Sequence, residues 1–177
     1  MTNRSMRTIA GLSATLVIFL VAGCTQKQTG PGEPIKDKVI QMEVFKQASC
    51  KCCGKWVDHM ESAGFEVNTR NQINLSAIKN EYSIQSRYQS CHTGVADGYI
   101  FEGHIPASLV QRFLEEKPVD AIGLAVPGMP VGSPGMEIGE RFDSYDVLVL
   151  KTDGSSEIYA HIDRPGWTDP ASSIQPR

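Results

Sequence analysis

The sequence predicts a mixed α/β domain with a small mixed sheet flanked by helices, and three observations lead to this prediction. Val39–Phe45 alternates apolar and polar residues as a strand does. Apolar residues of Cys53–Ala63 recur at helical spacing, and Gly64 supplies a helix stop. Phe65–Thr69 then alternates again, so the order strand–helix–strand indicates a parallel β-α-β unit. Asp153-Gly154 between two apolar runs indicates an antiparallel hairpin.

The remaining elements follow in chain order. Leu75–Tyr82 is predicted to be a second helix, and Gly94–Phe101 a strand. Pro106–Glu116 is predicted to be a helix with proline in its first turn, where no backbone N–H is needed. Val119–Gly139 is expected to be a long Gly/Pro-rich loop around a short apolar run. The predicted strands of the hairpin are Tyr145–Lys151 and Glu157–Ile162.

One helical stripe of Cys53–Ala63 carries the apolar residues that should face the core. Trp56 and Met60 lie on this stripe and are expected to be buried. His59 lies off the stripe and is expected to face solvent.

Residues 1–23 are predicted to be a lipoprotein signal peptide. Arg4 and Arg7 precede a short apolar stretch, Ile9–Val21, and Val21-Ala22-Gly23-Cys24 has the form of a bacterial lipobox. Cys24 would then be acylated, and two or more acyl chains hold a protein stably on a membrane. An ordinary signal peptide with a chance cysteine is the alternative. Because Thr25-Gln26 lacks the aspartate linked to inner-membrane retention, we expect a periplasm-facing lipoprotein of the outer membrane, for a two-membrane bacterium.

The mature chain is expected to contain one folded domain. Residues 24–38 read as the lipidated cysteine and a flexible tether, residues 39–163 as the domain, and residues 164–177 as a poorly ordered Pro- and Ser-rich tail. Removal of residues 1–23 leaves 15 basic and 20 acidic residues, a formal charge of −5. This balance lacks the basic face that nucleic-acid binding requires, so no nucleic-acid partner is expected.

Cys50-Lys51-Cys52-Cys53 places three thiols within four residues. Cys50 and Cys53 form a Cys-x-x-Cys pair suited to redox chemistry, but the additional Cys52 favours binding of a thiophilic metal, with Cu(I) the first candidate. The motif ends the first predicted strand and opens the first helix, which is the thioredoxin-like position, where a helix N-terminus stabilises thiolate. If Cys24 is lipidated, Cys91 is the fourth thiol of an otherwise odd set of five.

Imidazole and thioether groups on later segments could complete a copper site. His92 adjoins Cys91, and His104 directly precedes a predicted helix. Met129 and Met136 lie in a Gly/Pro-rich loop, where a methionine has little helical or strand face to pack on. A thioether that remains accessible is a good Cu(I) ligand.

Four motifs resemble those of the CopG-like periplasmic copper-resistance proteins, a family often catalogued only as a metal-binding domain of unknown function. The resemblance spans Val39 to Ile162 and implies a thioredoxin-like fold, thiolate-bound copper and a role in handling or changing the redox state of periplasmic copper. The resemblance implies that the thiol set of the family consists here of Cys50, Cys52, Cys53 and Cys91. His92, His104, Met129 and Met136 lie in matching motifs, whereas the lipobox is not expected throughout the family. The motifs are Cys50-x-Cys-Cys53, Cys91-His92-Thr93, Gly98-Tyr99-x-x-Glu102-Gly103-His104-x-Pro106-Ala107 and the segment Gly123–Met136.

The sequence-based hypothesis is a copper-binding protein that holds Cu(I), passes copper to other periplasmic copper-handling proteins and is not primarily an enzyme. The same sulfurs would bind Cu(I) in one state and form disulfides in another. Three alternatives stay open at this point. They are a metal-free thiol–disulfide oxidoreductase that uses Cys50 and Cys53, a lipoprotein whose cysteines only form structural disulfides, and a zinc or iron–sulfur site.

Overall fold

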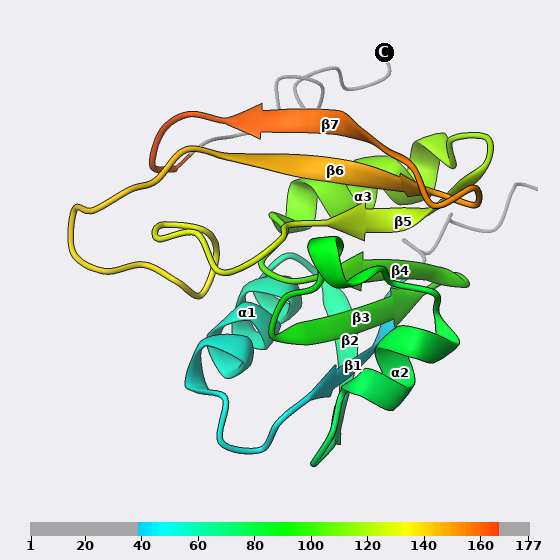
Figure 1. Ribbon diagram of the computed structural model, residues 1–177. Helices are drawn as coiled ribbons and strands as arrows, with labels where there is room; N and C mark the ends of the chain where they lie inside the picture. The colour runs from blue at the N-terminus through cyan, green and yellow to red at the C-terminus, as the bar shows by residue number, and fades with distance from the viewer. Residues whose placement is uncertain (1–38, 167–177) are drawn as a thin grey trace, which may run out of the picture. The chain divides into compact units, whose positions relative to one another are not determined.

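The computed structural model describes residues 39–166 (Figure 1). The predicted signal peptide, Cys24, the tether and the tail from residue 167 onward lie outside the described residues. The strands are β1 (Ile40–Lys46), β2 (Phe65–Asn71), β3 (His92–Ala96), β4 (Tyr99–Glu102), β5 (Ala121–Ala125), β6 (Tyr145–Lys151) and β7 (Ser156–Ile162). The helices are α1 (Lys51–Ser62), α2 (Ser76–Glu81) and α3 (Ala107–Glu116), with a 3₁₀ turn η1 at Ser86–Tyr88. Within this part of the chain, no helix has the length and apolar character needed to cross a membrane.

The strands form one mixed sheet in the order β2-β1-β3-β4-β5-β6-β7, which confirms the predicted α/β class. β1 and β2 are parallel and joined by α1, as the sequence predicts. β3 lies antiparallel to both β1 and β4, so the β1–β4 portion with its helices is compatible with a thioredoxin-like core. β5 joins β4 in parallel, and β6 and β7 extend the sheet beyond the small one expected.

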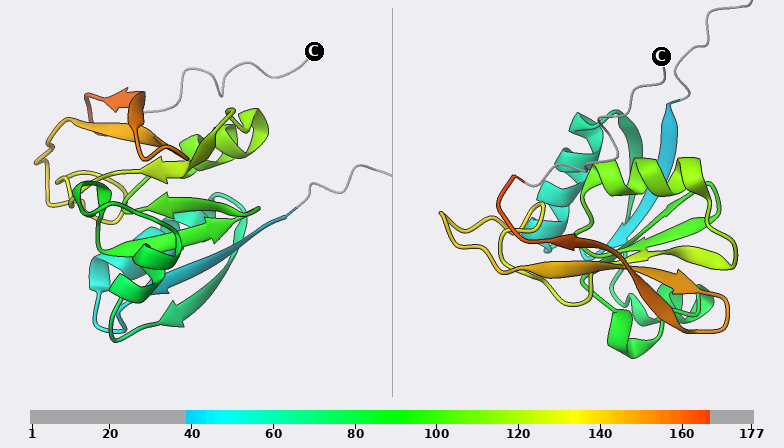
Figure 2. Two further views of the ribbon diagram at one scale, coloured as in Figure 1. Left: turned by 45° about the vertical axis from the view of Figure 1, so that its right-hand side comes forward. Right: turned by 90° about the horizontal axis from the view of Figure 1, so that it is seen from above.

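Helices cover both faces of the sheet, with α1 and α3 on one face and α2 on the other (Figure 2). Because strand side chains alternate between faces, neighbouring residues enter different clusters. Phe101 packs with the buried residues of α1 and α3, whereas Ile100 packs with Ile84 and Tyr88 on the opposite face. The apolar stripe of α1 is confirmed, since Trp56 and Met60 are fully buried.

Two strand predictions require correction. Gly94–Phe101 was expected to be a single strand but is the turn of the β3–β4 hairpin with parts of both strands. Asp97 and Gly98 both have positive φ, 50° and 82°, which suits the two-residue turn that an Asp-Gly pair favours. The short apolar run in the segment expected to be a loop is β5, which is stabilised by pairing with two other strands.

His59 was predicted to face solvent, but its side chain is half-buried. Its Nε2 atom accepts a hydrogen bond of 3.0 Å from the backbone N–H of Ala107. Ala107 is the first residue of α3, where backbone N–H groups lack helical partners. His59 therefore links α1 to the start of α3, a tertiary contact that helical periodicity alone does not show.

Candidate metal centre

The three clustered cysteines lie at the start of α1, which begins at Lys51, two residues earlier than predicted. Cys50 is the N-cap residue, and its sulfur accepts a hydrogen bond of 3.3 Å from the N–H of Cys53. Cys50 and Cys53 are joined by a disulfide, with their Cα atoms 5.4 Å apart. Cys52 is free, and its Sγ lies 3.5 Å from Cys50 Sγ. The motif thus separates into a disulfide-bonded pair, Cys50 and Cys53, and a free thiol, Cys52, beside it.

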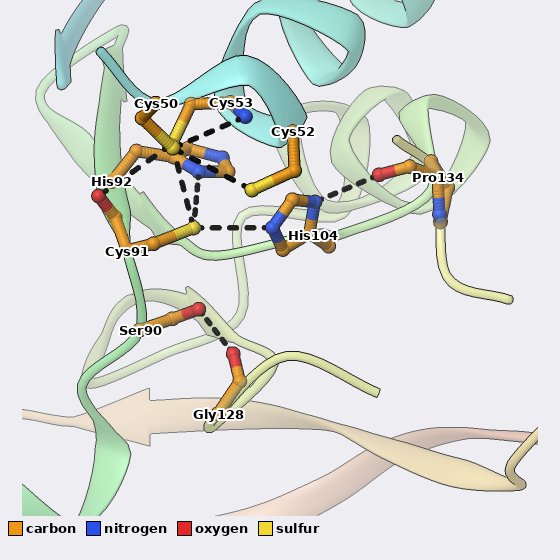
Figure 3. Close-up of a disulfide and its surroundings, with 9 residues drawn as sticks. All are labelled: Cys50, Cys52, Cys53, Ser90, Cys91, His92, His104, Gly128 and Pro134. Atoms are coloured by element: carbon orange, nitrogen blue, oxygen red, sulfur yellow. Dashed lines mark hydrogen bonds between the residues drawn. A yellow bond between two sulfur atoms is a disulfide. The ribbon is translucent and has the colours of Figure 1, made fainter. Parts of the chain in front are cut away.

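Cys91 brings the fourth sulfur to this cluster from a distant part of the chain. Its Sγ lies 3.5 Å from Cys53 Sγ (Figure 3). The cause is the antiparallel pairing of β3 with β1, in which His92 lies opposite Lys46. The residue before β3 therefore lies beside the end of β1, close to where the cysteine motif begins. The sulfur atoms of the four cysteines all lie within 4.8 Å of one another.

Two buried imidazoles approach the Cys91 sulfur. His92 Nδ1 lies 3.3 Å and His104 Nε2 3.1 Å from Cys91 Sγ. His104 is the second residue after β4, and the backbone N–H of Gly103 donates a hydrogen bond to the carbonyl of His92, which holds the two histidine segments together. The rings lie 4.9 Å apart in an edge-to-face arrangement, and His92 also contacts Trp56. Cys91, His92 and His104 form a second group whose ligand atoms lie within 4.8 Å of one another.

His104 is oriented by the loop between β5 and β6. Its Nδ1 atom lies 2.8 Å from the carbonyl oxygen of Pro134, which accepts a hydrogen bond from a protonated Nδ1. A neutral His104 in this tautomer presents a lone pair on Nε2 toward Cys91. Metal-ligating histidines typically have such a partner on the other ring nitrogen. Sequence reasoning did not identify Pro134, although its Ser133-Pro134-Gly135-Met136 motif was recognised.

Burial keeps both imidazoles neutral. Burial, followed by the charges of His104 and Lys79, holds the pKa of His92 well below its ordinary value, against the Gly103 backbone, which favours protonation. Burial also lowers the pKa of His104, although the Pro134 carbonyl and Glu137 partly oppose it. His92 Nε2 is buried and makes no hydrogen bond of ordinary geometry within residues 39–166. Neutral imidazole is the form that binds metal.

The Cys91 thiol is held in its protonated form. Burial, together with the charge of Cys52, raises its pKa to about 12. A metal that binds here must displace this proton, as is usual for thiolate ligands. In the metal-free site the protonated Cys91 thiol and the Cys50–Cys53 disulfide therefore lie beside neutral imidazoles, and a cation that binds to the Cys91 sulfur releases a proton.

The two predicted methionine ligands lie on turns that contact the thiol segments. Met129 is 53% exposed, and the neighbouring Gly128 is hydrogen-bonded through its backbone to Gln89 and Ser90, directly before Cys91. The backbone of Gly135, next to Met136, packs so closely on α1 that a Cβ atom there would lie 2.7 Å from the Cys52 carbonyl. These contacts position the turns, while copper ligation by either thioether stays a prediction.

Two solved structures are similar to this chain. They are described as copper resistance protein CopG, Form 2 and Form 1. Form 2 is 40% identical with a TM-score of 0.68, and the match covers 71% of this chain and 100% of that structure. Form 1 is 41% identical with a TM-score of 0.67, and the match covers 73% and 100%. The family described as "Protein of unknown function, DUF411" matches residues 88–136, and no curated protein matches the chain.

The raised pKa of Cys91 predicts slow alkylation in the metal-free disulfide form. Alkylation proceeds through thiolate, and a higher pKa leaves less thiolate at any pH below it. At pH 8 we expect Cys91 to react at least about tenfold more slowly than in the urea-unfolded chain, with the rate rising as pH approaches 11. Mass spectrometry of the labelled peptides measures this rate. Equal rates at pH 8 in the folded and unfolded chains would contradict the burial argument.

Proposed function

The chain belongs to the family of the copper resistance protein CopG, and on that premise we propose that it binds copper as its cargo and holds it as Cu(I). The observation that carries this proposal is the convergence of sulfur and nitrogen donors on Cys91. Its sulfur lies 3.5 Å from Cys53 Sγ, 3.3 Å from His92 Nδ1 and 3.1 Å from His104 Nε2. Thiolate and imidazole are the ligands that copper prefers in proteins, and a thiolate-rich set selects Cu(I). Met129 and Met136 are the further proposed ligands.

The Cys50–Cys53 pair would also change the redox state of copper. In the reduced protein, the two thiols would give one electron to each of two Cu(II) ions. Two Cu(I) ions, one Cys50–Cys53 disulfide and two released protons would result. Cys52 and Cys91 would hold Cu(I) beside the new disulfide, and an external dithiol reductant would restore the pair. The short distances from Cys52 and Cys91 to the disulfide sulfurs, 3.5 Å each, support this coupling.

The proposed location is the periplasmic side of the cell envelope. Residues 1–23 would direct export, lipidated Cys24 would anchor the chain to the membrane, and the domain would exchange copper with other periplasmic copper-handling proteins. The support is the lipobox in the sequence, Val21-Ala22-Gly23-Cys24. An outer-membrane anchor is part of this proposal.

A thiol–disulfide oxidoreductase acting on protein cysteines is the second candidate function. The disulfide between Cys50 and Cys53 at the start of α1 favours it. The free thiols of Cys52 and Cys91 beside that disulfide favour copper instead, since a simple dithiol exchange needs only two sulfurs. The two functions therefore differ in their dependence on Cys52.

A titration with Cu(I) distinguishes these functions. The chain carrying Cys24→Ser is reduced, kept anaerobic and titrated against a competing chelator. We expect at least one Cu(I) to bind, and Cys52→Ser and His104→Ala each to weaken binding by about tenfold or more, because each removes a ligand. His161→Ala is the matched control, since His161 is exposed on β7 and hydrogen-bonded to Asp146.

Two results would speak against copper binding. One is no Cu(I) uptake in competition with the chelator. The other is a Cys52→Ser variant that binds copper normally. If the same variant still reduces a protein disulfide at the wild-type rate while copper binding is absent, the oxidoreductase function is favoured.

The lipid anchor is tested by cell fractionation. Cys24→Ser removes the acylated sulfur and should move the protein from the membrane fraction to the soluble periplasmic fraction. Immunoblots of the separated fractions measure this shift. A Cys24→Ser variant that stays in the membrane fraction would show that the lipobox assignment is wrong.

A further inference from the structure

Glu102 at the end of β4 is fully buried and accepts three hydrogen bonds. Its Oε1 atom accepts a 2.6 Å hydrogen bond from the backbone N–H of Ser90 and contacts the ammonium group of Lys79. Its Oε2 atom accepts a hydrogen bond of 2.6 Å from the hydroxyl of Thr93. Lys79 on α2 is 4% exposed and also lies 3.3 Å from the Thr93 hydroxyl. The carboxylate is therefore fully satisfied inside the protein.

The partners of Glu102 lie on both sides of the Cys91-His92 pair. Ser90 directly precedes these two residues and Thr93 directly follows them. One carboxylate thus fixes both ends of the four-residue segment that carries a thiol and an imidazole. Gly103, the next residue after Glu102, packs against Ser90 so closely that a Cβ atom would lie 2.6 Å from Ser90 Cβ. The segment that carries His104 is therefore packed against the same Ser90–Thr93 segment.

The Glu102 carboxylate lies on the face of the sheet that α2 covers. Ile100 packs on the α2 face, and Glu102, two residues later on the same strand, shares that face. On β3, Val95 packs in that same cluster, so Thr93 also faces α2, and His92 points to the opposite face, where it contacts Trp56 of α1. Glu102 consequently contacts the Ser90–Thr93 segment from the face of the sheet opposite to that on which His92 lies.

Net stability is a weak explanation for this buried ion pair. Removing two charges from water is costly, and well-packed apolar residues of similar volume are often at least as stabilising. What a carboxylate offers that an apolar side chain lacks is directed hydrogen bonding to a particular backbone N–H and hydroxyl. Sites that hold metal ions depend on such outer contacts to orient the ligands.

We propose that Glu102, held by Lys79, is a positioning residue that sets the Cys91 thiol and the His92 and His104 imidazoles for metal binding. This inference rests on the proposed copper function and deepens it. Glu102 acts through Ser90, Thr93 and the chain continuing into Gly103, and the metal-binding atoms themselves belong to the cysteines and histidines.

The test compares Glu102→Gln with the parent chain, both carrying Cys24→Ser. Two quantities are measured, the Cu(I) affinity and the ratio of the alkylation rates of Cys91 and Cys52 in the metal-free disulfide form. We expect Glu102→Gln to lower the Cu(I) affinity about 10- to 100-fold. The Cys91/Cys52 rate ratio should rise at least about threefold, because the Cys91 segment is released while Cys52 on α1 is not. Val147→Ala, a buried change on β6, controls for a general loss of stability and should alter neither quantity.

Thr93→Val keeps the ion pair and the side-chain shape while removing one hydrogen bond to the carboxylate, so it serves if Glu102→Gln does not fold. It should shift both quantities in the same direction by a smaller factor. Unchanged affinity and unchanged rate ratio in the folded variants would overturn the inference, as would equal losses in Val147→Ala. If the parent chain binds no Cu(I), the copper function fails, and the rate ratio, which needs no copper, still decides whether Glu102 positions Cys91.

Discussion

The antiparallel pairing of β3 between β1 and β4 is the constraint on which the site depends. Its register sets His92 opposite Lys46 at the end of β1 and Thr93 opposite Glu102 at the end of β4. Cys91 therefore reaches the cysteines of α1 on one side, and His104 reaches Cys91 from the other. A slip of one residue would exchange the faces of His92 and Thr93. The imidazole would then point toward Lys79 and the hydroxyl toward Trp56, and neither group of donors would form.

The electrostatics of the site follow from its burial. Imidazoles whose pKa is lowered and a thiol whose pKa is raised are neutral groups, so a metal-free site can be buried without unpaired charge. The charged carboxylate and ammonium groups, Glu102 and Lys79, lie on the opposite face and are paired with each other. Entry of a cation would release the Cys91 thiol proton, which gives a physical reason for a coupling between copper binding and proton release.

Local patterns in the sequence predicted α1, the β-α-β unit, the final hairpin and the family. The Asp97-Gly98 turn carries the same signal as Asp153-Gly154, but the flanking strands are short and were merged into one. β5 was missed because its stability comes from neighbours on both sides. The groups that orient the site's cysteine and histidine side chains could not be predicted from local sequence patterns either. The Pro134 carbonyl and the Glu102 carboxylate gain their roles only through contacts between residues 30 and 12 positions apart in the chain.

X-ray absorption at the copper edge of the copper-loaded, reduced chain reports both the oxidation state of the bound copper and the atoms bound to it. We expect a Cu(I) edge and a first shell dominated by sulfur with imidazole nitrogen, and a loss of sulfur scattering in Cys91→Ser. A first shell of nitrogen and oxygen alone, or a spectrum identical in Cys91→Ser, would contradict Cu(I) binding at Cys91.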